Sequence, residues 1–133
     1  MLPPSSIPLT LLTGFLGSGK TTLLNRLLRD PALTGTAVLI NEVGAVGLDQ
    51  LIVERADDEV LLLESGCLCC TLSGDLACSL TELRERSEAG RIGALSRIVI
   101  ETTGLADPAP VIRNLLRDAS LARHFRLAGV VTT

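Results

Sequence analysis

Two short stretches of the chain contain residues whose types and spacing are suited to chemistry, and the first is GFLGSGKTTLLN, residues 14–25. Gly14, Gly19, Lys20 and Thr21 match the phosphate-loop pattern G-x-x-x-x-G-K-[S/T]. Glycines let the backbone turn its N–H groups inward, and the positive end of a following helix completes a cradle for phosphate oxygens. Lys20 then places a positive charge at the β- and γ-phosphates, and the Thr21 hydroxyl can bind a bridging Mg²⁺.

The same loop contains further candidate contacts to a nucleotide. Gly17 adds conformational freedom, and the Thr22 hydroxyl is a candidate donor to a phosphate. The alternative is a glycine-rich turn between a strand and a helix, and glycines alone would leave that interpretation competitive. The Gly-Lys-Thr triplet, with an expected strand before it and an expected helix after it, favours a nucleoside triphosphate site.

A carboxylate that holds the metal, usually through water, is expected at the end of another strand. Glu101 ends the apolar run RIVIE, residues 97–101. A buried strand-end carboxylate without a role is the weaker interpretation, because an unpaired buried carboxylate is costly. Gly104 can bring a backbone N–H to the γ-phosphate and let the following segment move between states.

A second acidic loop, NEVGAVGLD, covers residues 41–49. Its two glycines and two acids suit a mobile segment that contacts Mg²⁺ or water, with Glu42 and Asp49 as the candidates. A solvated turn with ordinary acidic residues is an equally good interpretation of this loop.

Three cysteines within four positions, Cys67, Cys69 and Cys70, form the second stretch. Three thiolates this close can share one soft cation such as Zn²⁺ or Cu(I), with cobalt and nickel as further candidates. The fourth ligand would be water, a carboxylate such as Glu64, or a partner's side chain. Small buried thiols and a redox pair at Cys69 and Cys70 are the alternatives, and the spacing favours metal. Cys78 is expected to be a spare thiol.

The composition narrows the classes of partner. Hydrophobic residues make up 47% of the 133 residues but aromatic residues only 2%, and the net charge is −3. Few aromatic rings and no positive excess argue against nucleic-acid binding. No apolar run approaches the ~20 residues of a membrane span, and the first residues lack a secretory signal pattern. We therefore expect a cytoplasmic protein with reduced cysteines, and the only histidine, His124, at its surface.

Strand and helix patterns mostly alternate along the chain. Buried strands are expected over residues 7–13, 36–40, 59–63, 97–101 and 126–132. Helices are expected over residues 20–30, over residues 71–86, and from Pro108 onward with Asp107 as its N-cap. Such alternation predicts an α/β fold with a mainly parallel sheet and helices on both faces. Residues 1–8 are expected to be a loose lead-in, and the blunt end after an apolar strand suggests a truncated chain.

Taken together and in this order, four motifs resemble those of the CobW-type (CobW/HypB/UreG) P-loop GTPases, metal-linked relatives of the urease and hydrogenase maturation GTPases. The motifs are GFLGSGKTTLLN, NEVGAVGLD, GCLCC and ETTGLADPAPV. The resemblance implies that residues 9–133 are the N-terminal portion of a P-loop GTPase domain. It also implies that GTP binding and hydrolysis are coupled to the handling of zinc or cobalt, for delivery to a client metalloprotein.

The resemblance also implies roles for individual residues. Glu101 would replace the usual Walker-B aspartate, and Glu42 would belong to the first switch region. The phosphate contacts would come from Gly17, Ser18, Gly19, Lys20, Thr21 and Thr22, and the metal thiolates from Cys67, Cys69 and Cys70.

The chain departs from the family pattern in two places. Many relatives read NEFGE where this chain reads NEVGA, so Ala45 removes a carboxylate and Val43 replaces an aromatic ring. The NKxD element that reads guanine in the family should lie beyond the last strand, and it is missing from residues 1–133, as is the usual C-terminal domain. The alternative functions are a P-loop ATPase or kinase with structural cysteines, and a metal-buffering module without hydrolysis. An exposed strand edge could also pair with a second copy of the chain.

Overall fold

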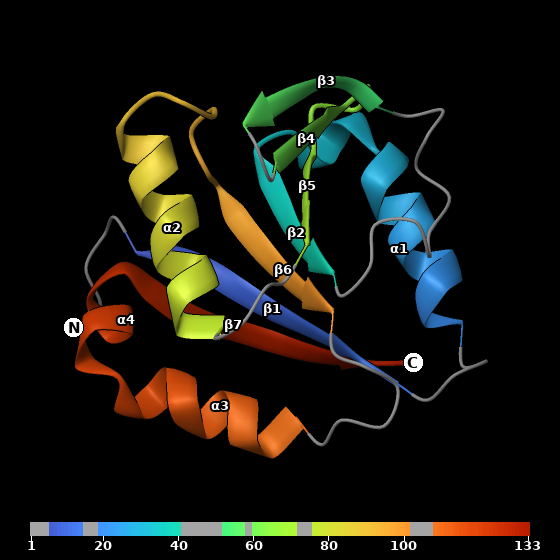
Figure 1. Ribbon diagram of the computed structural model, residues 1–133. Coiled ribbons are helices and arrows are strands. Elements are labelled where there is room, and N and C mark those ends of the chain that lie inside the picture. The colour runs from blue at the N-terminus through green and yellow to red at the C-terminus, as the bar shows by residue number, and fades with distance from the viewer. Residues whose placement is uncertain (1–5, 15–18, 41–51, 58–59, 72–75, 102–107) are drawn as a thin grey trace.

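The structure, a computed structural model, describes residues 6–14, 19–40, 52–57, 60–71, 76–101 and 108–133. Its described residues form one seven-stranded sheet with the strand order β3-β4-β5-β2-β6-β1-β7 (Figure 1). The strands are β1 (Ile7–Thr13), β2 (Thr36–Ile40), β3 (Ile52–Asp57), β4 (Val60–Leu63), β5 (Leu68–Thr71), β6 (Arg97–Glu101) and β7 (Phe125–Thr132).

Five neighbouring strands of the sheet are parallel to one another. β1 lies between β6 and β7, and β2 lies between β5 and β6, all in parallel pairs. All five residues of β2 are buried, as expected for a strand covered on both faces. The antiparallel pairs β3–β4 and β4–β5 extend the sheet on one side. The prediction of a mainly parallel sheet is therefore confirmed.

Helices cover both faces of this sheet. They are α1 (Lys20–Arg29), α2 (Leu76–Glu88), α3 (Pro108–Arg117) and α4 (Ala119–His124), with a short 3₁₀ helix at Pro31–Leu33. Leu24 and Leu28 of α1 pack on one face, whereas Leu80 of α2, Leu115 of α3 and Leu121 of α4 pack on the other. Figure 1 shows α2, α3 and α4 together on one side and α1 apart from them.

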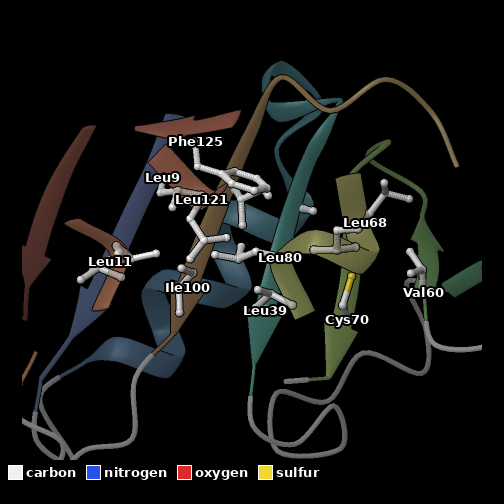
Figure 2. Packing of buried hydrophobic residues seen from close by; sticks show 14 of the residues in the cluster. Leu9, Leu11, Leu39, Val60, Leu68, Cys70, Leu80, Ile100, Leu121 and Phe125 are labelled. Atoms are coloured by element: carbon white, nitrogen blue, oxygen red, sulfur yellow. The ribbon is translucent and has the colours of Figure 1, made fainter. Parts of the chain in front are cut away.

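Two apolar cores result from the alternation of side chains along the strands. Leu9, Leu11, Leu39 and Ile100 belong to the core on the side of α2, α3 and α4 (Figure 2). Their neighbours Leu12, Val38, Ile40 and Val99 belong to the core on the side of α1. Because successive side chains in a strand point to opposite faces, each buried strand supplies both cores.

Most of the predicted elements agree with the structure, and the differences have local causes. The strands predicted at residues 7–13, 36–40 and 97–101 have the observed bounds, and the last strand begins one residue earlier, at Phe125. The prediction that a helix begins at Thr71 was wrong, because Thr71 ends β5 and α2 begins at Leu76. Strands β3 and β5 and the six-residue helix α4 were not predicted. β1 begins at Ile7, within the range expected for the lead-in.

Candidate functional site

The ends of β1 and β6 bring the first group of candidate residues together. β1 and β6 are hydrogen-bonded neighbours, and Leu12 of β1 is the register partner of Glu101. The chain leaves β1 through Gly14, and α1 starts at Lys20. The carboxyl ends of the parallel strands therefore form one edge, at which Gly14, Lys20 and the strand-end carboxylate of Glu101 lie close together.

Helix α1 begins after a glycine whose backbone conformation disfavours other residues. Gly14 has a φ of 152° and the N-cap residue Gly19 has a φ of 98°, in the left-handed region. A residue with a Cβ would be strained at this cap, which favours glycine there. Gly19 also has no side chain with which to cap the helix. The backbone N–H groups of the first turn are therefore suited to an external anion.

Lys20 and Glu101 form an ion pair at this edge. The Lys20 Nζ lies 2.8 Å from the Glu101 Oε1, and the side chains are only 8% and 13% exposed. The Lys20 ammonium also donates a hydrogen bond of 3.3 Å to the Gly14 carbonyl oxygen. A buried ammonium group requires such partners, because removing a charge from water without compensation is costly. Two candidate residues from separate motifs thus meet, together with the first glycine of the loop.

The structure describes only some of the other residues that the sequence predicts for a nucleotide site. Thr21 and Thr22 lie in the first turn of α1, and Thr22 is exposed. Gly17, Ser18, Glu42, Asp49 and Gly104 lie outside the described residues. Sequence reasoning named both Lys20 and Glu101 but did not predict their direct contact. The signal was present, because both residues were expected at the carboxyl edge of the same parallel sheet.

The three clustered cysteines do not converge. Cys67 immediately precedes β5, Cys69 and Cys70 lie within it, and all three are buried. Cys67 and Cys69 belong to the core on the side of α1, whereas Cys70 belongs to the opposite core, where Figure 2 labels it. Among the residues that the structure describes, no three His, Cys, Asp or Glu side chains are grouped so that they could hold a metal ion.

The surroundings of two of these cysteines, Cys67 and Cys69, differ in what they do to the thiol. The Cys67 Sγ lies 3.4 Å from the Leu33 carbonyl oxygen and 3.7 Å from that of Leu27, as a donor to both. Burial, and secondly the charge of Cys67 when ionised, raises the pKa of the Cys69 thiol to about 12. Because metal binding needs thiolates, the observed position of β5 disfavours a metal at Cys69.

Three described residues outside the cysteine cluster were also considered in the sequence, and none joins it in a group that could hold a metal ion. Glu64, the suggested fourth ligand, is exposed in the turn between β4 and β5. Cys78 is exposed on α2, in agreement with a spare thiol. His124 ends α4 and is half-buried.

A cavity of about 270 Å³ lies beside α1 and is lined mainly by apolar side chains of α1 and the sheet, among them Leu23, Leu27 and Val99. Neither Lys20 nor Glu101 lines it. The cavity is therefore separate from the charged edge of the sheet.

A membrane-crossing helix, long and apolar enough for a bilayer, does not occur in the described residues.

Comparison with known proteins places the chain in a family of nucleotide-binding proteins. The family model described as "CobW/HypB/UreG, nucleotide-binding domain" matches residues 8–133. The zinc chaperone YjiA of Escherichia coli is 43% identical over 126 residues, which are 94% of this chain and 39% of that protein. The zinc-regulated GTPase metalloprotein activator 1 of Schizosaccharomyces pombe is 38% identical over 95% of this chain and 31% of its own length.

A solved structure of one of these relatives has a similar fold. The crystal structure of the zinc-bound YjiA GTPase from E. coli matches with a TM-score of 0.77 and 36% identity, over 96% of this chain and 40% of that one. The chain thus spans about two fifths or less of the length of these relatives. With a match over nearly its whole length, the chain belongs to the CobW/HypB/UreG family, as its nucleotide-binding domain.

Proposed function

We propose that this chain is the nucleotide-binding part of a metal chaperone that binds and hydrolyses GTP and couples nucleotide state to the binding or transfer of zinc. The observation that carries the proposal is the buried contact between the Lys20 Nζ and Glu101, at the edge where Gly14 and the end of β6 lie. Relatives that are named zinc chaperones and zinc-regulated GTPases support the choice of nucleotide and metal.

In this proposal the triphosphate lies on the backbone N–H groups of residues 14–22, with Lys20 at the β- and γ-phosphates. The oxygen donors Thr21 and Glu101 suit Mg²⁺, a hard cation that prefers oxygen ligands. When bound, Mg²⁺ would neutralise charge that develops on the phosphates during hydrolysis. Glu42 would orient the attacking water, and the Gly104 N–H would contact the γ-phosphate.

Zinc is the cargo of the proposed chaperone, with cobalt as the second candidate, and Cys67, Cys69 and Cys70 are the proposed thiolate ligands. The observed β5 sets a condition on this assignment, because Cys70 faces the opposite core from the other two cysteines. Zinc loading must therefore either rearrange β5 or use fewer than three of these thiolates. Zinc competition against a chromophoric chelator, for each single Cys→Ala variant, separates the two routes. Equal losses support a rearranged three-thiolate site.

Coupling between nucleotide and zinc is the functional core of the proposal. By linkage, zinc changes the affinity for GTP by the same factor as GTP changes the affinity for zinc. A titration with a non-hydrolysable GTP analogue, in zinc-loaded and zinc-free protein, measures that factor. Identical affinities in the two titrations would refute the coupling.

A second candidate is a P-loop ATPase or kinase whose cysteines are structural. It is favoured by the burial of Cys67, Cys69 and Cys70 in the two apolar cores. Competition of ATP against GTP for the site distinguishes the two functions. Preference for ATP, together with unchanged stability on addition of zinc, would favour this second candidate.

The proposed setting is the cytoplasm, where thiols stay reduced. A client metalloprotein would receive the zinc, and a second copy of the chain is a further proposed partner. Sedimentation in the presence and absence of GTP tests the dimer. A monomer under both conditions would refute it.

A further inference from the structure

We propose that the cavity beside α1 is a binding site for a free medium-chain monocarboxylate. The carboxylate of this ligand lies at Thr36 and Arg97, and its apolar chain fills the rest of the cavity. The site is separate from the proposed nucleotide edge, because neither Lys20 nor Glu101 lines it. The proposal therefore does not depend on the proposed function, and it can fail while that function stands.

Apolar side chains from the helix and from the sheet form most of the cavity wall. Leu23 and Leu27 of α1 line one side, and Leu12, Val38 and Val99 of the central strands line the other. The volume is about 270 Å³. An engineered apolar cavity of roughly 150 Å³ takes up benzene, with its six carbon atoms. By that proportion this cavity holds roughly ten non-hydrogen atoms, which is the size of octanoate.

A buried hydroxyl group makes one end of this cavity polar. Thr36 and Arg97 are the first residues of β2 and β6, they are register partners, and both line the cavity. Thr36 is only 2% exposed, and its Oγ1 has no hydrogen-bond partner among the described residues. A buried hydroxyl group without a partner is unfavourable. The Thr36 Oγ1 is therefore available for a hydrogen bond to a ligand.

The neighbouring guanidinium group sets the sign of the ligand's charge. Arg97 is exposed and makes no ion pair within the part of the chain that the structure describes, and none of the described residues that line the cavity is acidic. A guanidinium group can bind one carboxylate through two parallel hydrogen bonds, and the Thr36 hydroxyl can donate a third. A single carboxylate satisfies both polar groups, whereas a second charge would have to enter the apolar part at a cost.

Exposed residues at the boundary of the cavity give the ligand a way in. Val131 of the edge strand β7 lines the cavity and is 44% exposed, and Arg97 is exposed at the polar end. A chain that enters here buries its carbon atoms against leucine and valine side chains, and the affinity grows with the apolar area covered. Cys67 also lines the cavity, so the bound acid lies next to the first cysteine of GCLCC.

Isothermal titration calorimetry with octanoate tests the proposal on the whole chain, at neutral pH, where the acid is ionised. We expect saturable binding at one site with a Kd of roughly 1 mM or below. Octanamide has the same size but no charge, and butyrate has the charge but a shorter apolar chain. Both should bind at least about tenfold more weakly than octanoate.

Two variants remove the polar contacts one at a time. Arg97→Gln should weaken octanoate binding about tenfold and leave octanamide binding unchanged, because it removes only the cation. Its matched control is Arg117→Gln, at another exposed arginine, which ends α3 on the opposite face of the sheet and should match wild type. Thr36→Val keeps a similar shape and removes the unpartnered hydroxyl, so it should fold and bind octanoate about fivefold more weakly.

A third variant tests whether the ligand lies inside the cavity. Leu27→Trp adds bulk at the cavity wall and should abolish octanoate binding, whereas Leu116→Trp, at an exposed position on α3, should not. If Leu27→Trp does not fold, as judged by circular dichroism, Arg97→Gln decides the test, because Arg97 is exposed and lies outside the apolar cores.

The result that would overturn the proposal is a wild type that does not bind octanoate saturably. Equal octanoate affinity in wild type and Arg97→Gln would overturn it as well, because the carboxylate would then not be at Arg97. Neither result bears on the nucleotide site, which a separate titration with GTP tests.

Discussion

The charged end of the sheet and the cysteine segment at β5 are two predicted sites. The fold brings the residues of the first together and separates those of the second. At the charged end, Lys20 and Glu101 are 81 positions apart in the sequence yet 2.8 Å apart in space. In β5, Cys69 and Cys70 are adjacent in the sequence but belong to cores on opposite faces of the sheet. Closeness along the chain is therefore a poor guide to a shared site when the segment is a strand.

The physical cause lies in the elements that present the residues. Parallel strands all end at one edge, so the loops and side chains that follow them converge there. Within a strand the side chains alternate, so that consecutive residues are separated by the sheet itself. The first site is built by the topology of the sheet, whereas the second needs β5 to change before all three thiols can meet.

The largest effect is expected at the charged end. Glu101→Leu leaves the Lys20 ammonium buried without this carboxylate, so the free energy of unfolding should fall by about 3 kcal/mol. Glu88→Leu disrupts the exposed pair with Arg84 and should cost about 0.5 kcal/mol or less. Urea unfolding of both variants measures the difference. Equal stability of the two would contradict the structural importance of the buried pair.

A smaller effect is expected in β5. Cys69→Ser places a hydroxyl group in an apolar core, at a side chain that is 0% exposed, and should cost about 1–3 kcal/mol. Cys78→Ser, at the exposed position on α2, should stay within about 0.5 kcal/mol of wild type. The same unfolding assay applies to both. If Cys69→Ser were as stable as wild type, Cys69 would not be packed in the core.

The pH dependence of stability gives a third test. The Cys69 thiol has a pKa of about 12 in the folded protein and an ordinary value of 9.0 in the unfolded chain. Above pH 9 the unfolded chain therefore loses its proton first, and stability present below about pH 9 declines as the pH rises toward about 12. Between pH 9 and 10 the decline from this group should be about 1 kcal/mol. Cys69→Ala should lack this part of the decline, and parallel curves for the two proteins would argue against the burial.

Thiol reactivity gives the smallest and simplest contrast. In zinc-free protein, iodoacetamide should modify the exposed Cys78 at least about tenfold faster than Cys67, Cys69 or Cys70, which are buried. Peptide mass spectrometry over time gives the four rates. Similar rates for Cys78 and the β5 cysteines would mean that β5 opens readily, which would make zinc loading at these thiols easier than the described structure implies.

The sequence predicted the strand ends that form the charged edge better than it predicted the cysteine segment and the short elements. The placement of Gly14 and Glu101 at one edge was predictable, because Gly14 follows the apolar run of residues 7–13, Glu101 ends the shorter run of residues 97–101, and the ends of parallel strands meet at one edge. β5 was not predicted, because this four-residue strand, LCCT, has too few positions to show a period of two. The leucine repeat from Leu72 to Leu83 carried the predicted helix back to Thr71, whereas the helix itself starts at Leu76. Helix α4, with six residues, is too short for a helical period to be read.

The central claim is that the loop before α1 holds nucleotide phosphates through Lys20, and one binding measurement tests it most directly. A non-hydrolysable GTP analogue is titrated with Mg²⁺ into wild type, Lys20→Ala and the control Arg29→Ala, which removes an exposed charge from the end of the same helix. We predict saturable binding by wild type and by Arg29→Ala, and a loss of at least about 100-fold for Lys20→Ala, which no longer has its charge at the phosphates. Wild-type affinity in Lys20→Ala would contradict the account.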